Sequence, residues 1–344
     1  MLNVAAITGG LDVPSARFRV RQYIPALHSH GVCLKEFQSR TSAYPPPQRW
    51  QRPAWAALRL AEMAGVALRS RRYDVTLLQR EMLSTLATLE RLTGRPRVLD
   101  VDDAIHLYRD GATAKTLAMQ CDRIICGNPH LAEIYRQWNR DVVVLPTAVD
   151  TERYCPAAPG TSDSNRDVIV LGWIGTSANL RYLQDIEPAL VTVLKQYPNA
   201  MLHVVCDKPP QMKVIEPARV KYTAWSAANE VAAIQSFSIG LMPLEDSPWA
   251  RGKCSFKMLQ YMACGLPVVV SPVGMNADVL KLGDIGCGAD TVTEWVEALI
   301  HLVEGEAIRL RLGTNGREIA LRAFSVAALA PRLAGFVSSA GRLS

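Results

Sequence analysis

Short apolar runs rich in β-branched residues alternate with stretches of helical periodicity along almost the whole chain. In the first half, these runs predict strands at Val4–Thr8, Val32–Phe37, Val75–Gln79, Arg97–Val101, Arg123–Cys126 and Val142–Leu145. We expect a helix in each interval between consecutive strands. Strands that alternate with helices form βαβ units, and successive units build a parallel, doubly wound sheet.

The pattern stops at residues 155–166, which have many turn formers and read as a linker, and then resumes. The second series predicts strands at 168–173, 201–206, 219–223, 239–243 and 267–271. The sequence therefore predicts an α/β protein with two tandem Rossmann-like domains facing a central cleft, where open α/β sheets bind ligands. We expect an N-terminal domain at 1–150, a C-terminal domain at 151–325 and a helix at 326–344 that packs back on the first domain.

Net charge is unevenly distributed over the chain, which carries +6 at pH 7. Residues 1–150 contain 20 basic and 14 acidic residues, whereas residues 151–344 contain 18 of each. Either the first half meets an anionic partner, such as a membrane or a phosphorylated substrate, or the excess only serves solubility. No nucleic-acid-binding motif accompanies this modest basicity, so we expect no nucleic-acid partner.

Metal-binding and targeting motifs do not stand out. The eight cysteines include no Cys-x-x-Cys pair, and the six histidines include no His-Glu-x-x-His motif. We therefore expect no structural zinc site and a reducing, cytoplasmic location. The first ten residues lack the features of a signal peptide, and no apolar run reaches the 18 residues of a membrane span.

The segment Arg251–Gly274 has the strongest chemical signal. Lys253 and Lys257 are four residues apart, so we expect them on one face at the start of a helix. A helix N-terminus offers unpaired N–H groups and a positive dipole end, which together with these cations attract an anion such as a diphosphate. Cations at this end oppose the dipole, which favours a functional role over a solvated surface.

Within this segment, residues Lys257–Gly274 resemble the donor-site signature of the family 4 retaining glycosyltransferases, through Lys-Met-Leu-Gln-Tyr-Met-Ala-Cys-Gly-Leu-Pro-Val-Val. Further similar stretches are Gly127-Asn128, Leu145–Asp150, Leu171–Ser177 and Ile239–Leu244. The resemblance implies the GT-B fold, a nucleotide-sugar donor as co-substrate, no other cofactor and no metal.

Two positions depart from the family pattern. Many members have two glutamates separated by seven residues, one contacting the donor sugar and one the nucleotide ribose. Here these positions are Gly252 and Gln260. Gln260 can still hydrogen-bond hydroxyl groups, whereas Gly252 offers only its backbone. The chain is closest to a branch in which Trp-Ala-Arg-Gly-Lys replaces the first glutamate, and we infer that Arg251 and Lys253 compensate as diphosphate ligands.

Other donor-binding candidates follow the predicted strands of the second domain. Gly175 and Thr176 lie in a strand-to-helix turn that allows close backbone approach, with Thr176 replacing the family's phosphate-binding arginine. The alternative is an ordinary capped turn. Trp225 occupies the position where the family holds the nucleobase, or else it belongs to the core.

Acceptor-binding candidates lie in the first domain. Asp102, Asp103 and His106 follow a strand, where clustered carboxylates raise one another's pKa values. We read Asp103 and His106 as ligands of the acceptor hydroxyl rather than as a metal site, although a helix cap is an equal alternative. Gly10 and Arg17 belong to the first glycine-containing loop. Arg17 and Arg19, two residues apart, face different sides of a helix, so we do not expect both to serve.

Residues 49–72 contain six arginines and one glutamate beside Trp50, Trp55 and several aliphatic residues. Such a helix can lie on an anionic membrane surface, which suits a lipid-linked acceptor. The alternative is a domain helix with its apolar face in the core and its arginines in water. In the first case the protein would be peripheral on the inner face of the plasma membrane.

Taken with the resemblance, these motifs predict a retaining, metal-independent glycosyltransferase. It would move a sugar from a nucleotide diphosphate to a hydroxyl of a glycan, a lipid-linked acceptor or a cell-surface polysaccharide precursor. Arg251, Lys253 and Asp103 are the predicted catalytic residues. The alternative is a catalytically degenerate GT-B subunit that binds a nucleotide or a partner enzyme without transfer.

Overall fold

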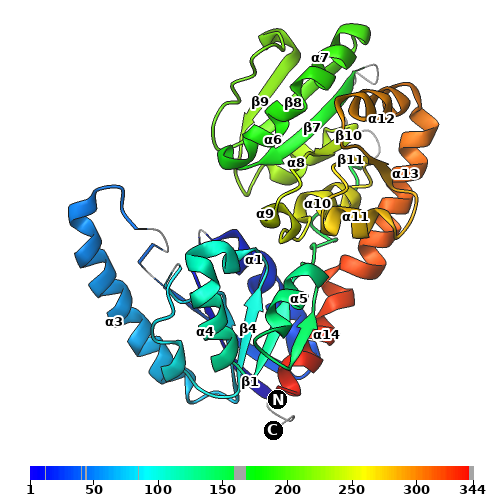
Figure 1. Cartoon of the computed structure of the whole chain (residues 1–344). Coiled ribbons are helices and arrows are strands. Elements are labelled where there is room, and N and C mark those ends of the chain that lie inside the picture. Colours follow the sequence, from blue (N-terminus) through cyan, green and yellow to red (C-terminus); the bar gives the residue numbers. More distant parts are fainter. Residues whose placement is uncertain (12, 40, 43–44, 84, 159–167, 341–344) are drawn as a thin grey trace. The chain divides into compact units, whose positions relative to one another are not determined.

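The computed structural model describes residues 1–11, 13–39, 41–42, 45–83, 85–158 and 168–340 (Figure 1). The chain forms two compact units. Unit 1 comprises Met1–Ala148, Arg251–Cys254 and the residues from Val326 onward, and unit 2 comprises Val149–Ala250 and Ser255–Ser325. Each unit contains a six-stranded parallel sheet with helices, which confirms the prediction of two Rossmann-like domains. Of the predicted linker at 155–166, residues 159–166 lie outside the described residues.

Unit 1 has the strand order β2-β1-β3-β4-β5-β6. The strands are β1 Leu2–Thr8, β2 Val32–Gln38, β3 Val75–Gln79, β4 Arg97–Val101, β5 Arg123–Cys126 and β6 Val142–Val144. The helices are α1 Pro14–Arg19, α2 Ile24–Ser29, α3 Arg52–Ser70, α4 Ala112–Gln120, α5 Pro129–Arg136 and α14 Val326–Ser338. All residues of β3, β4 and β5 are buried, as expected for parallel strands covered on both faces.

The C-terminal helix α14 completes unit 1, where Figure 1 shows it in red beside the sheet. Its Leu329, Leu333 and Val337 are buried in one cluster with Tyr23 and Leu27. The Arg123 Nη1 atom donates a hydrogen bond to the Phe336 carbonyl oxygen at 2.6 Å. The helix therefore supplies part of the core beneath α2.

The predicted helix between β3 and β4 is wrong. Within the described part of this interval, the helical backbone is limited to a single 3-10 turn at Glu90–Leu92. The Glu90 carboxylate is buried and accepts hydrogen bonds from the backbone N–H groups of Met82 and Thr88. A side chain that satisfies these donors stabilises a compact loop in place of a helix.

Unit 2 has the strand order β12-β11-β10-β7-β8-β9. Its strands are β7 Ile169–Gly175, β8 Ala200–Cys206, β9 Val220–Ala224, β10 Ile239–Met242, β11 Val268–Val270 and β12 Gly286–Gly288. Its helices are α6 Leu180–Asp185, α7 Glu187–Gln196, α8 Glu230–Gln235, α9 Pro248–Arg251, α10 Phe256–Ala263, α11 Met275–Leu280, α12 Val292–Glu304 and α13 Glu306–Ile319, and a π-helical turn follows at Ala320–Phe324. The last residue of α9, Arg251, is grouped with unit 1.

Two features of unit 2 differ from the expected elements. The helix expected between β7 and β8 is divided at Ile186, because Pro188 favours the first turn of a new helix that begins at Glu187. The edge strand β12 was not predicted, since two of its three residues are glycines. In both sheets the order reverses beside the first strand, at β1/β3 and at β7/β10, and ligands of open α/β sheets bind at such switch points.

Candidate active site

In unit 2, the end of β7 brings together two of the predicted donor-binding residues. The Lys257 ammonium lies 5.1 Å from the centre of the Trp173 ring. A Cβ atom on Gly175 would lie 2.6 Å from Trp173 and 3.0 Å from the Lys257 side chain, so only glycine fits here. Lys257 is thus held over a buried aromatic ring at the carboxyl end of the sheet, where a cation–π contact stabilises the charge.

Side-chain hydrogen bonds hold the turn after β7, while Thr176 remains exposed. Asp207 accepts hydrogen bonds from the Ser177 N–H at 2.6 Å and from its hydroxyl at 2.8 Å. The net pKa of Asp207 is lowered. Burial alone would raise it, but the hydrogen bonds from Ser177 stabilise the charged carboxylate and outweigh burial. The Thr176 hydroxyl accepts from Asn179 at 2.8 Å. The Ser177 N–H, one of the backbone donors in this turn, is therefore already bonded to Asp207.

Trp225 directly follows β9 at the same edge of the sheet. Its side chain is 43% exposed, so the alternative of a core residue is wrong. Its indole N–H donates to Glu230 at 3.1 Å, and the buried Glu230 also accepts from Tyr154 at 2.7 Å and Arg153 at 3.0 Å. The ring is therefore oriented and remains partly exposed. It lies two strands from β7, a separation of about 10 Å.

Lys253 and Lys257 do not share a helix face, contrary to the prediction. Helix α10 begins only at Phe256, and Ser255 before it has a left-handed φ of 52°. Its hydroxyl donates to the Asn276 side chain at 2.6 Å, which holds the turn. Of the predicted donor residues, Lys257 and Gln260 lie on α10, and the Gln260 side chain is buried.

Residues 251–254, predicted as part of the second domain, group with unit 1 because they pack on it through the backbone. The Asn128 side-chain amide donates to the carbonyl oxygens of Arg251 at 3.3 Å and Lys253 at 3.0 Å. The Cys254 thiol donates to the carbonyl oxygen of Asp102 at 3.1 Å. We refer to residues 251–254 as the anchored segment.

Two glycines make this close packing possible. A Cβ atom on Gly252 would lie 2.6 Å from the Ala104 Cβ atom, and one on Gly127 would lie 2.3 Å from the Cys254 sulfur. No real Cβ atom tolerates such distances without displacement of its neighbours. The packing of Gly252 against Ala104 thus gives a physical reason why position 252 is a glycine.

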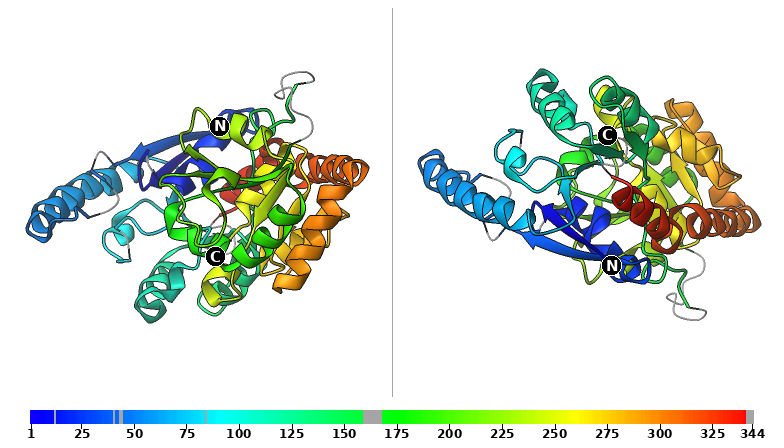
Figure 2. Two further views of the ribbon diagram at one scale, coloured as in Figure 1. Left: turned by 90° about the horizontal axis from the view of Figure 1, so that it is seen from above. Right: turned by 90° about the horizontal axis from the view of Figure 1, so that it is seen from below.

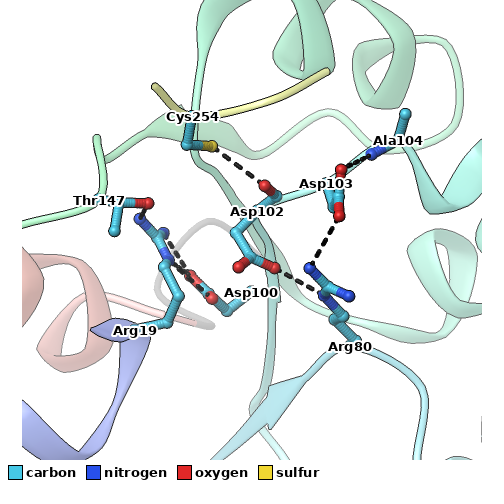
Figure 3. A network of polar contacts seen from close by, with 8 residues as sticks. All are labelled: Arg19, Arg80, Asp100, Asp102, Asp103, Ala104, Thr147 and Cys254. Atoms are coloured by element: carbon cyan, nitrogen blue, oxygen red, sulfur yellow. Dashed lines mark hydrogen bonds and ion pairs between the residues drawn. The ribbon is translucent and has the colours of Figure 1, made fainter. Parts of the chain in front are cut away.

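Aspartates within β4 and directly after it form ion pairs with arginines (Figure 3). Asp100 pairs with Arg19 at 2.5 Å, and both side chains are almost fully buried. Asp102 accepts from Arg80 Nε at 2.6 Å, and Asp103 lies 3.4 Å from Arg80 Nη2. Arg19 therefore adds no positive potential to a ligand site. Arg80 is a central residue that the sequence analysis missed, although its position directly after β3 was a usable signal.

Burial raises the pKa of Asp103, and the neighbouring Asp102 carboxylate adds to the rise, which Arg80 and Lys253 oppose only in part. The Asp103 side chain is 24% exposed, so it can still accept a hydrogen bond from a hydroxyl group.

His106 is half-buried in a 3-10 segment at Ile105–Gly111, and its Nδ1 atom is buried without a hydrogen-bond partner. Burial and the nearby His130 lower its pKa, so the ring is neutral at pH 7.

The remaining acceptor candidates lie in the first loop of unit 1. Gly10 has a φ of +123°, a conformation that requires glycine. The Arg17 guanidinium stacks on the Phe18 ring at 4.8 Å, and its side chain is half-buried. Gly10 and Arg17 are thus fixed locally, by the backbone conformation and by the ring contact.

Residues 165–305 match the family described as Glycosyl transferases group 1. That segment contains Gly175, Trp225 and Lys257. No curated protein matches the chain.

Among the described residues, no group of three or more His, Cys, Asp or Glu side chains is arranged to hold a metal ion. The helices in the described part of the chain are too short or too polar to cross a membrane.

Solved glycosyltransferases have a similar fold over the whole chain. Sucrose-phosphate synthase from Thermosynechococcus elongatus is 16% identical with a TM-score of 0.76, and the alignment covers 100% of both chains. HepE from Anabaena, solved with UDP-glucose, is 15% identical with a TM-score of 0.70 and coverage of 98% and 100%. WaaG, involved in lipopolysaccharide biosynthesis, is 11% identical with a TM-score of 0.66 and coverage of 97% and 99%. The fold is therefore GT-B.

Proposed function

We propose that the protein is a retaining, metal-independent glycosyltransferase that uses a nucleotide-diphosphate sugar. The observation that supports this proposal most directly is the arrangement at the carboxyl edge of the unit 2 sheet. Lys257 lies over the Trp173 ring beside Gly175, and the oriented Trp225 ring lies two strands away. This separation suits a nucleotide whose base stacks on Trp225 and whose diphosphate meets Lys257. The family match over this region supports the same assignment.

In this proposal, cations stabilise the charge that grows on the leaving diphosphate. Lys257 supplies one charge, and Arg251 and Lys253 of the anchored segment supply the others. Gly175 and Thr176 give the diphosphate close backbone approach, and Gln260 serves the ribose. Loss of one such preorganised contact typically costs about 10²–10³ in rate.

The acceptor hydroxyl belongs to a glycan, a lipid-linked acceptor or a cell-surface polysaccharide precursor. Asp103 and His106 accept and orient this hydroxyl, with Asp102 holding Arg80 in place. Gly10 and Arg17 line the approach. The support is that Asp103 remains partly exposed and that the His106 ring, three residues further along the chain, is neutral.

A direct test is incubation with UDP-, GDP- and ADP-sugars. UDP-sugars come first, because the HepE structures contain UDP and UDP-glucose. Lys257→Met and Lys253→Ala should each weaken nucleotide diphosphate binding about tenfold or more. Lys281→Met, an exposed lysine of unit 2, is the matched control. Unchanged affinity in both site variants, or no binding of any nucleotide sugar, would overturn the proposal.

The second candidate is a degenerate subunit that binds nucleotide without transfer. The packing of Gly252 against Ala104 favours it, because an acidic side chain at this position would displace Ala104. It predicts full nucleotide affinity with no sugar transfer, even when acceptors extracted from cells are supplied.

Helix α3 supports a peripheral membrane location. Its inward face contains Arg59, Met63 and Ala67, whereas Leu58 and Leu68 are 64% and 57% exposed. Trp50, just before the helix, is 79% exposed. The alternative that placed the apolar face in the core therefore describes only one side of the helix. The exposed apolar residues and neighbouring arginines suit the interface of an anionic membrane.

A further inference from the structure

Unit 1 contains a pocket of about 490 Å³ that the predicted acceptor residues do not line. It lies where β1 and β2 end and is closed on one side by the inward face of α3, the helix at one margin of unit 1 in Figure 2. Met82, which follows β3, also lines it. The pocket is therefore beside the β1/β3 switch point, at the edge where open α/β sheets bind ligands.

Arg59 provides a buried cation in this pocket. Its residue exposure is 2%, and its Nη1 and Nη2 atoms donate to the carbonyl oxygens of Thr41 at 2.6 Å and Met82 at 3.3 Å. Its Nε atom is buried without a hydrogen-bond partner. Arg59 forms no ion pair with the described residues. A buried guanidinium in this state is costly unless an anion binds to it.

The other charges leave the pocket net positive. Glu36 is neutralised by Arg21 through two contacts of 2.9 Å. Glu62 accepts from the Ser39 hydroxyl at 2.6 Å, a bond that lowers its pKa, so it is ionised and partly offsets Arg59. Lys35 and Arg69 add two exposed cations at the rim.

The remaining lining is suited to a sugar rather than a bare ion. Met63, Val66 and Phe37 give apolar surfaces, and the Gln38 and Ser39 side chains give hydrogen-bonding groups. Carbohydrates combine hydroxyl groups with apolar faces, and the volume of the pocket falls within the usual range for small ligands.

We propose that this pocket binds the anionic substituent of the acceptor, a carboxylate or phosphate on a sugar, through Arg59 with Lys35 and Arg69 at the rim. The inference rests on the proposed transfer reaction, because it names the class of acceptor. The Arg59 Nε–H group, which has no hydrogen-bond partner among the described residues, donates to the bound oxyanion. A neutral sugar lacks that oxyanion and binds at least tenfold more weakly.

Binding is measured on the full chain by calorimetry with D-glucuronate, D-glucose 6-phosphate, D-glucose and inorganic phosphate. The carboxylate and phosphate sugars separate the two sources of the anion. The Arg59 Nε–H resonance, assigned by its loss in Arg59→Lys, should shift on addition of the bound sugar. Equal binding of glucose and both anionic sugars would overturn the proposal, and so would inorganic phosphate binding as tightly as the sugar phosphate.

Variants separate this site from general charge effects. Arg59→Met should weaken binding of the anionic sugar tenfold or more. Arg69→Gln should also weaken it, and because Arg69 is exposed this variant tests the same pocket without affecting the core. Arg72→Gln, an exposed arginine outside the pocket, is the control. If Arg72→Gln weakens binding as much as Arg69→Gln, the proposal is wrong. This readout needs no nucleotide sugar, so failure of the transfer proposal would not be mistaken for failure of this one.

Discussion

Arg80 Nε lies 2.6 Å from Asp102 Oδ1, and the backbone of Arg80 is in the left-handed region with a φ of 62°. A non-glycine residue in this region costs of order 1 kcal/mol or more and persists only where the surroundings enforce it. Arg80 also reaches Asp103 at 3.4 Å, so one strained residue positions two carboxylates at the end of the sheet. Such strain at the carboxyl edge of a parallel sheet is typical of a functional site.

Arg80→Gln should remove the countercharge of both carboxylates. Because these side chains are only partly exposed, we expect a loss of about 1–2 kcal/mol of unfolding free energy, between the values of surface and buried pairs. Urea denaturation measures it. Arg95→Gln, which breaks the more exposed pair with Asp122, should cost less. An equal loss in both variants would mean that Arg80 is an ordinary surface arginine.

Gly252→Glu places an acidic side chain on the anchored segment and should destabilise unit 1. The new Cβ atom would meet Ala104 at 2.6 Å, and overpacking of this kind costs about 1–3 kcal/mol. Thermal unfolding measures the loss. The double variant Gly252→Glu with Ala104→Gly removes the opposing methyl group and should recover part of it. No recovery in the double variant would show that the contact with Ala104 is not the cause.

Trp225→Leu should weaken nucleotide binding about tenfold or more, because stacking of one base contributes about 1–3 kcal/mol. Stability should change little, since the ring is 43% exposed. Trp225→Phe retains an aromatic face and should bind more tightly than the leucine variant. Fluorescence titration with nucleoside diphosphates measures both, and equal affinities in wild type and Trp225→Leu would exclude stacking.

Acidification should destabilise unit 2 through His203. Burial and the nearby Lys221 lower the pKa of His203 to about 4, below its ordinary value of 6.5. The neutral ring bonds to Thr223 at 2.8 Å in the fold, so its contribution is complete above pH 6.5 and is lost as the pH falls towards 4. The loss is about 3 kcal/mol.

His203→Gln cannot take up this proton. Its stability should therefore decline less than that of the wild type between pH 7 and 4, as measured by urea denaturation at each pH. Parallel declines in the two proteins would contradict the assignment to His203.

Leu58→Glu with Leu68→Glu should reduce binding to anionic vesicles. Both side chains are exposed, so folding should persist while apolar burial in the interface is lost and repulsion is added. Flotation with phosphatidylglycerol vesicles measures it, with phosphatidylcholine vesicles as the control. Equal flotation of the wild type with both lipids would end the membrane proposal.

The strands were predictable because buried parallel strands are continuous apolar runs bounded by turn residues, as at Val75–Gln79 and Arg123–Cys126. The loop before β4 was not, because it depends on a single buried glutamate that binds distant backbone N–H groups. Likewise, nothing local to Lys253 shows that Asn128 holds its carbonyl oxygen. Asp102 and Asp103 were found from their spacing, but their partner Arg80 is adjacent only in the folded sheet.

The anchored segment is fastened by its carbonyl oxygens, by the Cys254 thiol and by two glycine contacts, none of which involves the side chains at 251 and 253. The Asn128 amide reads only backbone oxygens, which every residue type supplies. The hydrogen bonds from Asn128 therefore place no restriction on residue type at positions 251 and 253, whereas position 252 is restricted to glycine.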